Sequence, residues 1–349
     1  MRVLKWVGIV LGAVVVLAIG IFLYFKSAAQ AKLDQTYEVS VEPIPIPYPL
    51  TDGEVEALRK KRGAEQAVAA PTPSADAGVA EAEPAKAVDP LEGVDLKELA
   101  KERALERGKH YMASRAACME CHGEDFGGKV VVENPVMGSW IAPNITAKGK
   151  TKDYKPVDWV RLIRHCIKPD GRPATMPCQD FTWFSDQEIS DIVAYIKSRP
   201  AVDRQMPDST LGPVLAMLIA TGKIPLGAEE LDHKTPREKL PPRIAATVEL
   251  GKHLGATCSG CHGAGFAGGE IVGGDPAWPH ARNLTFHETG LAKWSLDDFK
   301  KALREGIRPD GTKIDKVMPT PYTSQLKDAE IEALYMFLQT VEKKPQGAH

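Results

Sequence analysis

The sequence predicts an all-α protein in which a single N-terminal membrane-spanning helix is followed by two tandem copies of one small helical domain. Three observations lead to this fold class. Residues 6–25 form an apolar run without a charge, a five-residue cysteine motif occurs twice, and the residues around each motif repeat in the same order. Repetition with a single long period indicates duplicated domains rather than a solenoid.

The two motifs predict the cofactor. They read Cys118-Met119-Glu120-Cys121-His122 and Cys258-Ser259-Gly260-Cys261-His262. The pattern C-x-x-C-H is the attachment signature of a c-type haem. Thiols three positions apart lie about one helical turn apart, so both can form thioethers to one porphyrin while the next histidine reaches the iron. We therefore predict two covalently bound haem c groups. A zinc-binding or redox C-x-x-C pair is the alternative.

The bulk composition agrees with small helical domains built around a cofactor. The 349 residues suffice for two or three domains. The formal net charge of −2 gives no indication of nucleic acid or of a strongly charged substrate. Aromatic residues make up only 7% of the chain, which suits domains in which a buried haem forms much of the core.

The apolar run predicts a transmembrane anchor over residues 6–26. At about 1.5 Å per residue it spans roughly 30 Å, the thickness of bilayer hydrocarbon. Arg2 and Lys5 precede it, so the positive-inside rule places the rest of the chain outside the cytoplasm. We expect the bacterial inner membrane, with the haem domains on the periplasmic side. A cleaved signal peptide is the alternative, because Ala29-Gln30-Ala31 has the A-x-A form.

Residues 27–95 are expected to form a Pro/Ala-rich stalk and tether. Alternate prolines between residues 43 and 49 forbid a helix and predict an extended, stiff segment. The basic run at residues 59–62 predicts a solvated helix face, with lipid contact as the alternative. Residues 64–90 are rich in Ala, Pro and acidic residues, which predicts a flexible tether that lets the haem domains swing.

The duplicated domains are expected at residues 96–200 and 245–343, joined by a linker over residues 201–244. Matching elements follow one another in both copies: Gly108-Lys109-His110 and Gly251-Lys252-His253, Asn144-Ile145-Thr146 and Asn283-Leu284-Thr285, Pro169-Asp170-Gly171 and Pro309-Asp310-Gly311, Thr175-Met176-Pro177 and Val317-Met318-Pro319. Each copy closes with an amphipathic helix, residues 186–198 and 328–340. Ser185 and Glu188 form a capping box at the start of the first.

These elements together resemble the class I dihaem cytochrome c family. Within it, the chain is similar to membrane-anchored cytochrome c subunits that accept electrons from bacterial periplasmic dehydrogenases of alcohols and sugar acids. The resemblance covers roughly residue 96 to the C-terminus. It implies two tandem class I cytochrome c domains. Members of the family often carry three haems, whereas this chain has two motifs, and its tether is longer than the family's usual entry.

The iron ligands are predicted to be one histidine and one methionine in each domain. His122 and His262 follow from the motif. Met176 and Met318 stand at matching positions, each before a proline that restricts its loop. The alternatives for the first domain are Met137 and Met206, and bis-histidine ligation by His110 and His253 is a further one. Asn144 and Asn283 are candidates for bonding the haem propionates, or for capping their own turns.

Two cysteines remain outside the motifs. Cys166 and Cys178 lie 12 positions apart and flank Met176. In an oxidising compartment two spare cysteines most often pair, so we expect a disulfide that holds the Met176 loop. The alternative is that Cys178 is itself an iron ligand, as in dihaem thiosulfate-oxidising enzymes.

We predict an electron carrier in a respiratory chain rather than an enzyme. His/Met ligation closes the iron to small ligands. The expected partners are redox proteins: a dehydrogenase or quinol-oxidising subunit on one side, and a soluble cytochrome or terminal oxidase on the other. The alternative is a dihaem redox enzyme of the peroxidase or thiosulfate-oxidising type. The apolar stretch at residues 214–220 of the linker is too short for a second span, and we expect it to pack on a haem domain or a partner subunit.

Overall fold

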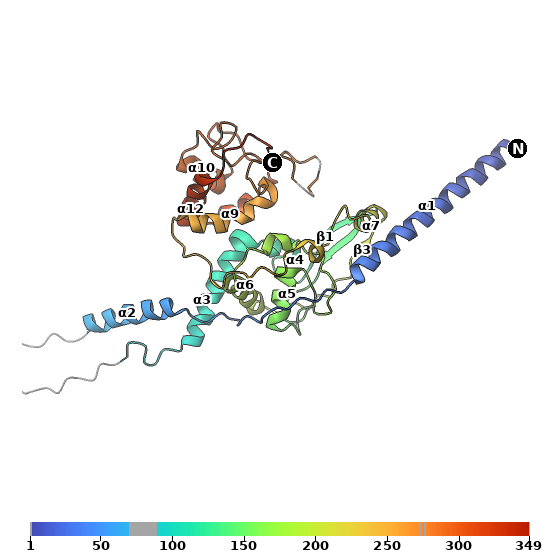
Figure 1. Cartoon of the computed structure of the whole chain (residues 1–349). Coiled ribbons are helices and arrows are strands. Elements are labelled where there is room, and N and C mark those ends of the chain that lie inside the picture. The colour runs from blue at the N-terminus through green and yellow to red at the C-terminus, as the bar shows by residue number, and fades with distance from the viewer. Residues whose placement is uncertain (1, 70–88, 272–273, 276, 349) are drawn as a thin grey trace, which may run out of the picture.

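The computed structural model describes residues 2–69, 89–271, 274–275 and 277–348. Figure 1 shows α1 projecting alone from a body in which the second domain, orange to red, is seated on the first, teal to green. The helices of the described residues are α1 (Arg2–Asp34), α2 (Asp52–Ala69), α3 (Leu96–Tyr111), α4 (Cys118–His122), α5 (Pro156–His165), α6 (Asp186–Ser198), α7 (Pro213–Ala220), α8 (Gly227–Glu230), α9 (Val248–His262), α10 (Leu296–Glu305), α11 (Thr320–Thr323) and α12 (Asp328–Thr340). A π-helix, η1 (Met112–Ala116), and a 3₁₀-helix, η2 (Cys178–Phe181), complete them.

Each domain is held together by the crossing of its first and last helices. In the first domain α3 packs on α6, and in the second α9 packs on α12. A glycine lies at each crossing: a Cβ built on Gly108 would overlap the backbone carbonyl of Asp191, and one on Gly251 would overlap that of Ala333. The repeated Gly-Lys-His therefore exists because the two helices touch backbone to backbone at this point.

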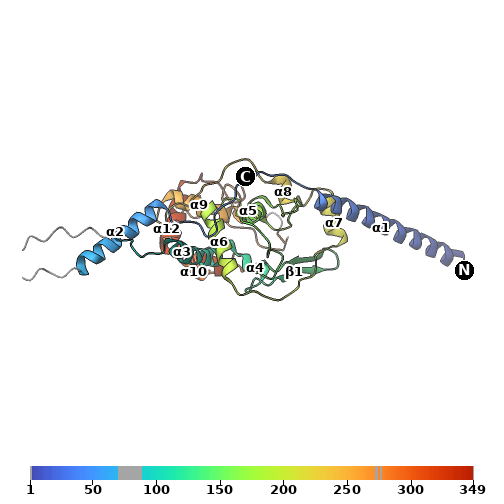
Figure 2. The ribbon, with the colours of Figure 1, turned by 90° about the horizontal axis from the view of Figure 1, so that it is seen from below.

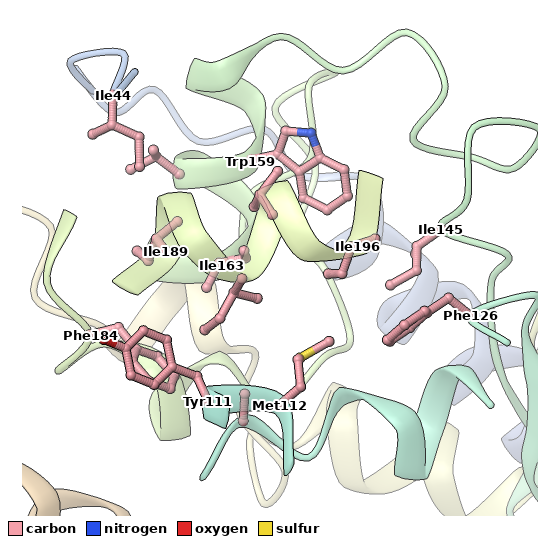
Figure 3. Packing of buried hydrophobic residues seen from close by; sticks show 14 residues of the cluster. Ile44, Tyr111, Met112, Phe126, Ile145, Trp159, Ile163, Phe184, Ile189 and Ile196 are labelled. Carbon is pink, nitrogen blue, oxygen red and sulfur yellow. The ribbon is translucent and has the colours of Figure 1, made fainter. Parts of the chain in front are cut away.

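The cores of the two domains are separate and are built from equivalent elements. Figure 3 shows the first, in which Met112 and Phe126 lie near Ile163, Ile189 and Ile196. The second core gathers the residues Leu250, Leu254, Phe266, Leu291, Phe299, Leu303, Leu326, Ile331, Ala333, Leu334 and Leu338. Both closing helices supply apolar residues to their cores, as the sequence predicts.

The first domain also contains a small antiparallel sheet that the all-α prediction does not include. Its strands are β1 (Lys129–Asn134), β2 (Gly138–Ala142) and β3 (Thr210–Leu211), in the order β1-β2-β3. The β-branched run Val130-Val131-Val132 and the turn at residues 135–137 favour a hairpin here. The domains remain predominantly helical, and the hairpin of β1 and β2 lies between α4 and α5.

The proline-rich segment is extended, as predicted, but it lies along the first domain instead of standing free. Ile44 is buried in the first core. Ser190 donates a hydrogen bond to the carbonyl of Pro45 over 2.6 Å, and the Tyr37 amide donates to the carbonyl of Gly171 over 2.9 Å. The first domain is thus attached directly beyond the end of α1. Figure 2 shows this segment running beneath the domain from α1 toward α2.

The predicted swinging tether falls largely outside the described residues, which exclude 70–88. The start of that stretch is helical, because α2 continues to Ala69. The first turn of α2 is held on α3, where Glu54 pairs with Arg103 at 3.2 Å and with Arg107 at 3.1 Å. With Ile44 packed before it, the attachment of the first domain to α1 does not run through this tether.

The apolar linker helix packs its side chains on α1, whereas we expected a haem domain or a partner subunit. It does touch the first domain at its start, where the Val214 amide donates to the carbonyl of Val136 over 3.1 Å. Ala216 and Ile219 of α7 form a small cluster with Ala29, while Phe25 and Leu33 pack against its edge. Within the described residues, α1 is the one helix long and apolar enough to cross a membrane. Its last turns, beyond the apolar run, therefore have a partner, whereas the apolar run itself projects away from the body (Figure 1).

The helix crossings lead to a first prediction. Gly251→Ala and Gly108→Ala should each lower the free energy of unfolding of their own domain by about 1–3 kcal/mol, because the added methyl group must separate two backbones. Chemical unfolding followed by haem absorbance and circular dichroism measures this. Gly53→Ala is the control, since a Cβ there meets open space on α2. Unchanged unfolding in the two crossing variants would show that the contact is not needed.

Candidate haem sites

The histidine of each motif is locked by one backbone carbonyl. His122 Nδ1 lies 2.8 Å from the carbonyl oxygen of Pro143, and His262 Nδ1 lies 2.7 Å from that of Arg282. A carbonyl only accepts, so Nδ1 carries the proton and donates. The lone pair is then on Nε2, the atom available to an iron. Burial lowers the pKa of both rings, although the bond to the carbonyl acts in the opposite direction, and this favours the neutral form that a metal requires.

The loop that follows each motif has the same backbone path in both domains. The amide of Gly128 donates to the carbonyl of His122, and the amide of Gly268 donates to that of His262, each over 2.9 Å. Phe126 is left-handed at φ +57°, and its counterpart Phe266 is left-handed at φ +58°. A strained conformation repeated at equivalent positions indicates a geometry that both copies require.

The cysteines and methionines predicted to face one haem lie around one core. Cys118 and Met176 both pack against the edge of the first core. Cys258 and Met318 pack in the same way against the second. The turn at each methionine is also shared, because its carbonyl accepts a bond from the amide two residues later, over 2.9 Å in the first copy and 2.7 Å in the second.

A buried donor without a protein acceptor fits a haem in the first domain. Trp159 is 3% exposed and belongs to the core that Cys118 and Met176 border. Its Nε1 has no hydrogen-bond partner. An unsatisfied buried N–H costs about 1–3 kcal/mol, so an acceptor is expected there. A haem propionate is such an acceptor, and the apolar lining, the paired thiols and the locked imidazole suit the rest of the group.

The alternative ligands are engaged elsewhere. The Nε2 atoms of His110 and His253 lie against carboxylates of the other domain. Met137 is in the turn that joins β1 and β2. Met206 packs against Gly128, whose amide donates to the backbone carbonyl of His122.

The asparagines bind backbone, which favours their role in turns. Asn144 Nδ2 donates to the carbonyl of Val202 over 2.7 Å, and Asn283 Nδ2 donates to that of Lys344 over 2.7 Å. Their Oδ1 atoms accept from the amides of Thr146 and Thr285. Each asparagine thereby joins the proximal loop to the segment after the closing helix, and both side chains are 2% exposed.

Sequence reasoning missed Pro143 and Arg282, whose carbonyls bond the histidines of the two motifs. Pro143 and Arg282 each stand directly before the repeated Asn-Ile-Thr or Asn-Leu-Thr. The asparagine turn fixes the peptide that precedes it and so presents that carbonyl to the ring. The signal was present in the sequence as the position next to a repeated motif, but a backbone acceptor has no residue type by which to recognise it.

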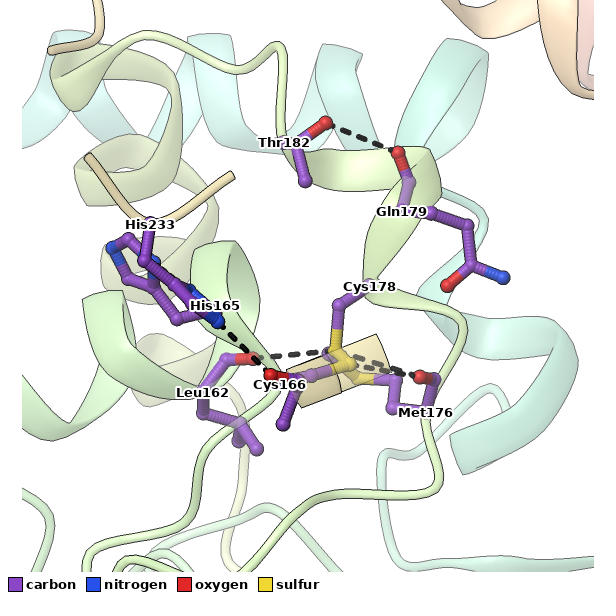
Figure 4. The surroundings of a disulfide bond; sticks show 9 residues. Leu162, His165, Cys166, Met176, Cys178, Gln179, Thr182 and His233 are labelled. Atoms are coloured by element: carbon purple, nitrogen blue, oxygen red, sulfur yellow. Dashed lines mark hydrogen bonds between the residues drawn. A yellow bond between two sulfur atoms is a disulfide. The ribbon is translucent and has the colours of Figure 1, made fainter. Parts of the chain in front are cut away.

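The two remaining cysteines form the predicted disulfide. Cys166 and Cys178 are bonded, fully buried, and lie beside Met176, as Figure 4 shows. The second copy has Gly306 and Thr320 at these positions, and a Cβ on Gly306 would lie 3.4 Å from Thr320 Oγ1. The two positions are thus close together in both domains, but a covalent link joins them only in the first. Because Cys178 is bonded in this way, it is not available as an iron ligand.

The disulfide gives a second prediction. The double variant Cys166→Gly, Cys178→Thr copies the second domain and should destabilise the first domain by about 3 kcal/mol, the value for a loop of this size. Denaturant unfolding followed through both haems should move one transition and leave the other. Reducing the native protein with a thiol should have the same effect. If neither treatment changes the first transition, the clamp contributes nothing.

Comparison with known proteins identifies the class and then the family. Two small helical domains, each with a C-x-x-C-H motif and a locked histidine, define a protein with covalent haem domains. The family model described as Cytochrome c matches residues 105–200 and 248–342, which is more than half of the chain. The chain therefore belongs to the cytochrome c family, and its two family domains imply covalently bound haem c.

Several bacterial proteins are similar over one domain. The fructose dehydrogenase cytochrome subunit of Gluconobacter japonicus is 34% identical over 101 residues, which are 27% of this chain and 21% of that protein. The cytochrome c subunit of alcohol dehydrogenase (quinone) from Gluconobacter oxydans (strain 621H) is 34% identical over 99 residues, 26% of this chain and 21% of that protein. The gluconate 2-dehydrogenase cytochrome c subunit of Pantoea cypripedii is 32% identical over 99 residues, 26% and 22% of the two chains. The match thus spans about a fifth of these relatives.

Proposed function

We propose that the chain is a membrane-anchored dihaem c-type cytochrome with two tandem class I domains, residues 96–200 and 245–343. It carries electrons from a periplasmic or membrane dehydrogenase, or a quinol-oxidising complex, to a soluble cytochrome or terminal oxidase. The observation that carries this proposal is the carbonyl-locked histidine, repeated in both family domains beside a matching methionine turn.

Each domain has a defined role for its residues toward the haem. Cys118 and Cys121 would hold the first haem by thioethers, and Cys258 and Cys261 the second. His122 and His262 would bind iron through Nε2. Met176 and Met318 would bind from the opposite side.

The haem supplies one-electron chemistry when bound, and the chain supplies ligands, a dry pocket and a fixed geometry. Ligation by one histidine and one methionine would raise the reduction potential relative to bis-histidine ligation, and it would exclude small molecules from the iron. The bonded state of Cys178 removes the thiolate that the thiosulfate-oxidising alternative requires. Electron transfer is then the chemistry that the ligand set favours.

The proposed location is the bacterial inner membrane, with the haem domains on the periplasmic side. An exposed apolar helix and Arg2 and Lys5 before its apolar run support this topology. The relatives are named as cytochrome subunits of dehydrogenases, which supports a dehydrogenase as the electron donor. Copurification of this chain with a dehydrogenase from gently solubilised membranes tests the partner.

The ligands are tested by substitution. Met176→His and Met318→His should each lower the potential of one haem by an amount on the order of 0.1 V, because imidazole stabilises the ferric state more than a thioether does. Each should also remove about half of the near-red absorption band that marks methionine bound to ferric haem. Potentiometric titration with absorption spectroscopy measures both effects.

Met137→Leu and Met206→Leu serve as controls and should leave the potentials and the band unchanged. Loss of the band in either control, with retention in Met176→His, would assign the first distal ligand elsewhere.

A further inference from the structure

Two histidine–carboxylate contacts join the haem domains, and they are reciprocal. His110 Nε2 lies 2.8 Å from Glu330 Oε2, and His253 Nε2 lies 2.9 Å from Glu188 Oε1. The two histidines end the repeated Gly-Lys-His, and the two glutamates occupy the same place in the first turn of α6 and α12. Each copy therefore offers its histidine to the glutamate of the other. This is the pattern of an isologous, two-fold interface, here built within one chain.

The contacts are dry and specific. The Glu188 and Glu330 side chains are 0% and 1% exposed, and the His253 and His110 side chains are 12% and 14% exposed. A buried carboxylate that loses its partner is costly, so the pairs fix one orientation of the domains. Burial acts to raise the pKa of Glu188, but Arg115 and His253 lower it to about 2, so the carboxylate is ionised and accepts from the Nε2–H.

Arg115 makes the two halves of the interface unequal. Its Nη1 lies 3.0 Å from Glu188 Oε1, at ion-pair distance though not aligned as a hydrogen bond. Arg115 belongs to η1. Cys118 follows His110 by eight positions, whereas Cys258 follows His253 by five, so the first copy has three additional residues here. The wide π-helical turn accommodates this insertion. The Arg115 guanidinium carbon lies 5.6 Å from the ring centroid of Trp183, and Trp183 in turn lies edge-to-face with His253.

A second reciprocal pair places the haem motifs at the same interface. The Tyr322 hydroxyl donates to Glu120 Oε1 over 2.6 Å. Asp180 Oδ1 lies 3.3 Å from the position of a Cβ on Gly260. Asp180 and Tyr322 both stand four residues after the methionine, and Glu120 and Gly260 both lie between the motif cysteines. The segment after each methionine thus covers the cysteine-bearing segment of the other domain, and η2 and α11 pack against α9 and η1.

The linker leaves the orientation of the domains to this interface. The last backbone hydrogen bond from the linker to the first domain is at Lys239, whose carbonyl accepts from the amide of Gln187 on α6. Residues 243–249, just before the body of α9, are exposed. A chain of this kind limits the distance between the domains but does not set their angle.

We propose that the four residues His110, Glu188, His253 and Glu330 are positioning residues for direct electron transfer between the two haems. The inference rests on the proposed function. The interface sets the cysteine-bearing segment of each domain, which would hold its haem, against the segment after the methionine of the other domain. With both haems bound, one electron would pass from the ferrous to the ferric group, and no bond or proton would move. Because tunnelling falls exponentially with separation, a fixed close approach makes the transfer fast.

The test compares electron exchange in the full-length, detergent-solubilised protein with both haems bound. In half-reduced native protein, the paramagnetically shifted haem methyl signals in proton NMR should be averaged by rapid exchange within the molecule. The double variant Glu188→Gln, Glu330→Gln removes both ionic contacts and should slow the exchange at least tenfold, with separate signals for the two one-electron species.

The matched control is Glu332→Gln. It breaks the pair with Lys300, which lies 2.7 Å away within the second domain and two residues along the same helix. The control should exchange like the native protein. If the double variant loses haem, the single variant His110→Gln replaces it, with an expected threefold decrease. Native exchange in a variant that has lost contacts but kept both haems would overturn the proposal.

The two proposals fail differently. If the native protein lacks the near-red absorption band of methionine-bound ferric haem, the proposed ligation is rejected. The rate of electron exchange between the haems would still report on the interface. A normal band with unchanged exchange in the variants would reject only the positioning role. A merely structural role would lower the unfolding temperature of the variants and leave the exchange rate as it is.

Discussion

The architecture depends on one steric constraint, the backbone contact between the first and last helix of each domain. Gly108 and Gly251 allow this contact because neither carries a side chain at the crossing. The first helix leads toward the haem motif, and the last begins with a buried glutamate. A fixed crossing therefore sets the distance from motif to glutamate. Since both copies share it, their surfaces are complementary to each other, and the reciprocal contacts follow from duplication.

Packing contacts attach α1 to the linker helix, the extended segment to the first domain, and the second domain to the first. The last turns of α1 are covered by α7, the extended segment places Ile44 in the first core, and the second domain is held on the first by buried charge. Each link is made by packing rather than by a flexible chain. Under the proposed function, an electron that enters at one domain would meet its next acceptor within the same molecule, which favours transfer through the molecule over delivery by a swinging arm.

Sequence reasoning was strongest where chemistry requires fixed spacing. The motifs, the duplication, the closing helices and the disulfide could be predicted because each has a local pattern or a matching copy. The contact of the proline-rich segment with the first domain could not be predicted, because proline spacing indicates an extended backbone but not the surface on which it lies. The hairpin was not predicted, although the β-branched run from Val130 to Val132 favours it.

The least predictable features are contacts between distant residues of ordinary type. His110 and Glu330 lie 220 positions apart, on helix faces that look solvated when each helix is considered alone. The carbonyls of Pro143 and Arg282 have no residue signature at all. The carbonyl contacts are visible only in the folded backbone of each domain. The histidine–glutamate contacts are visible only in the assembled pair of domains, which also explains why His110 and His253 could be mistaken for iron ligands.

Carbon monoxide binding to the reduced protein tests the central claim most directly. If each iron is held by imidazole on one side and by a thioether on the other, both haems will be low-spin as purified and neither will bind the gas at neutral pH. Stoichiometric carbonylation of one or both haems, with high-spin signals in the oxidised state, would contradict it.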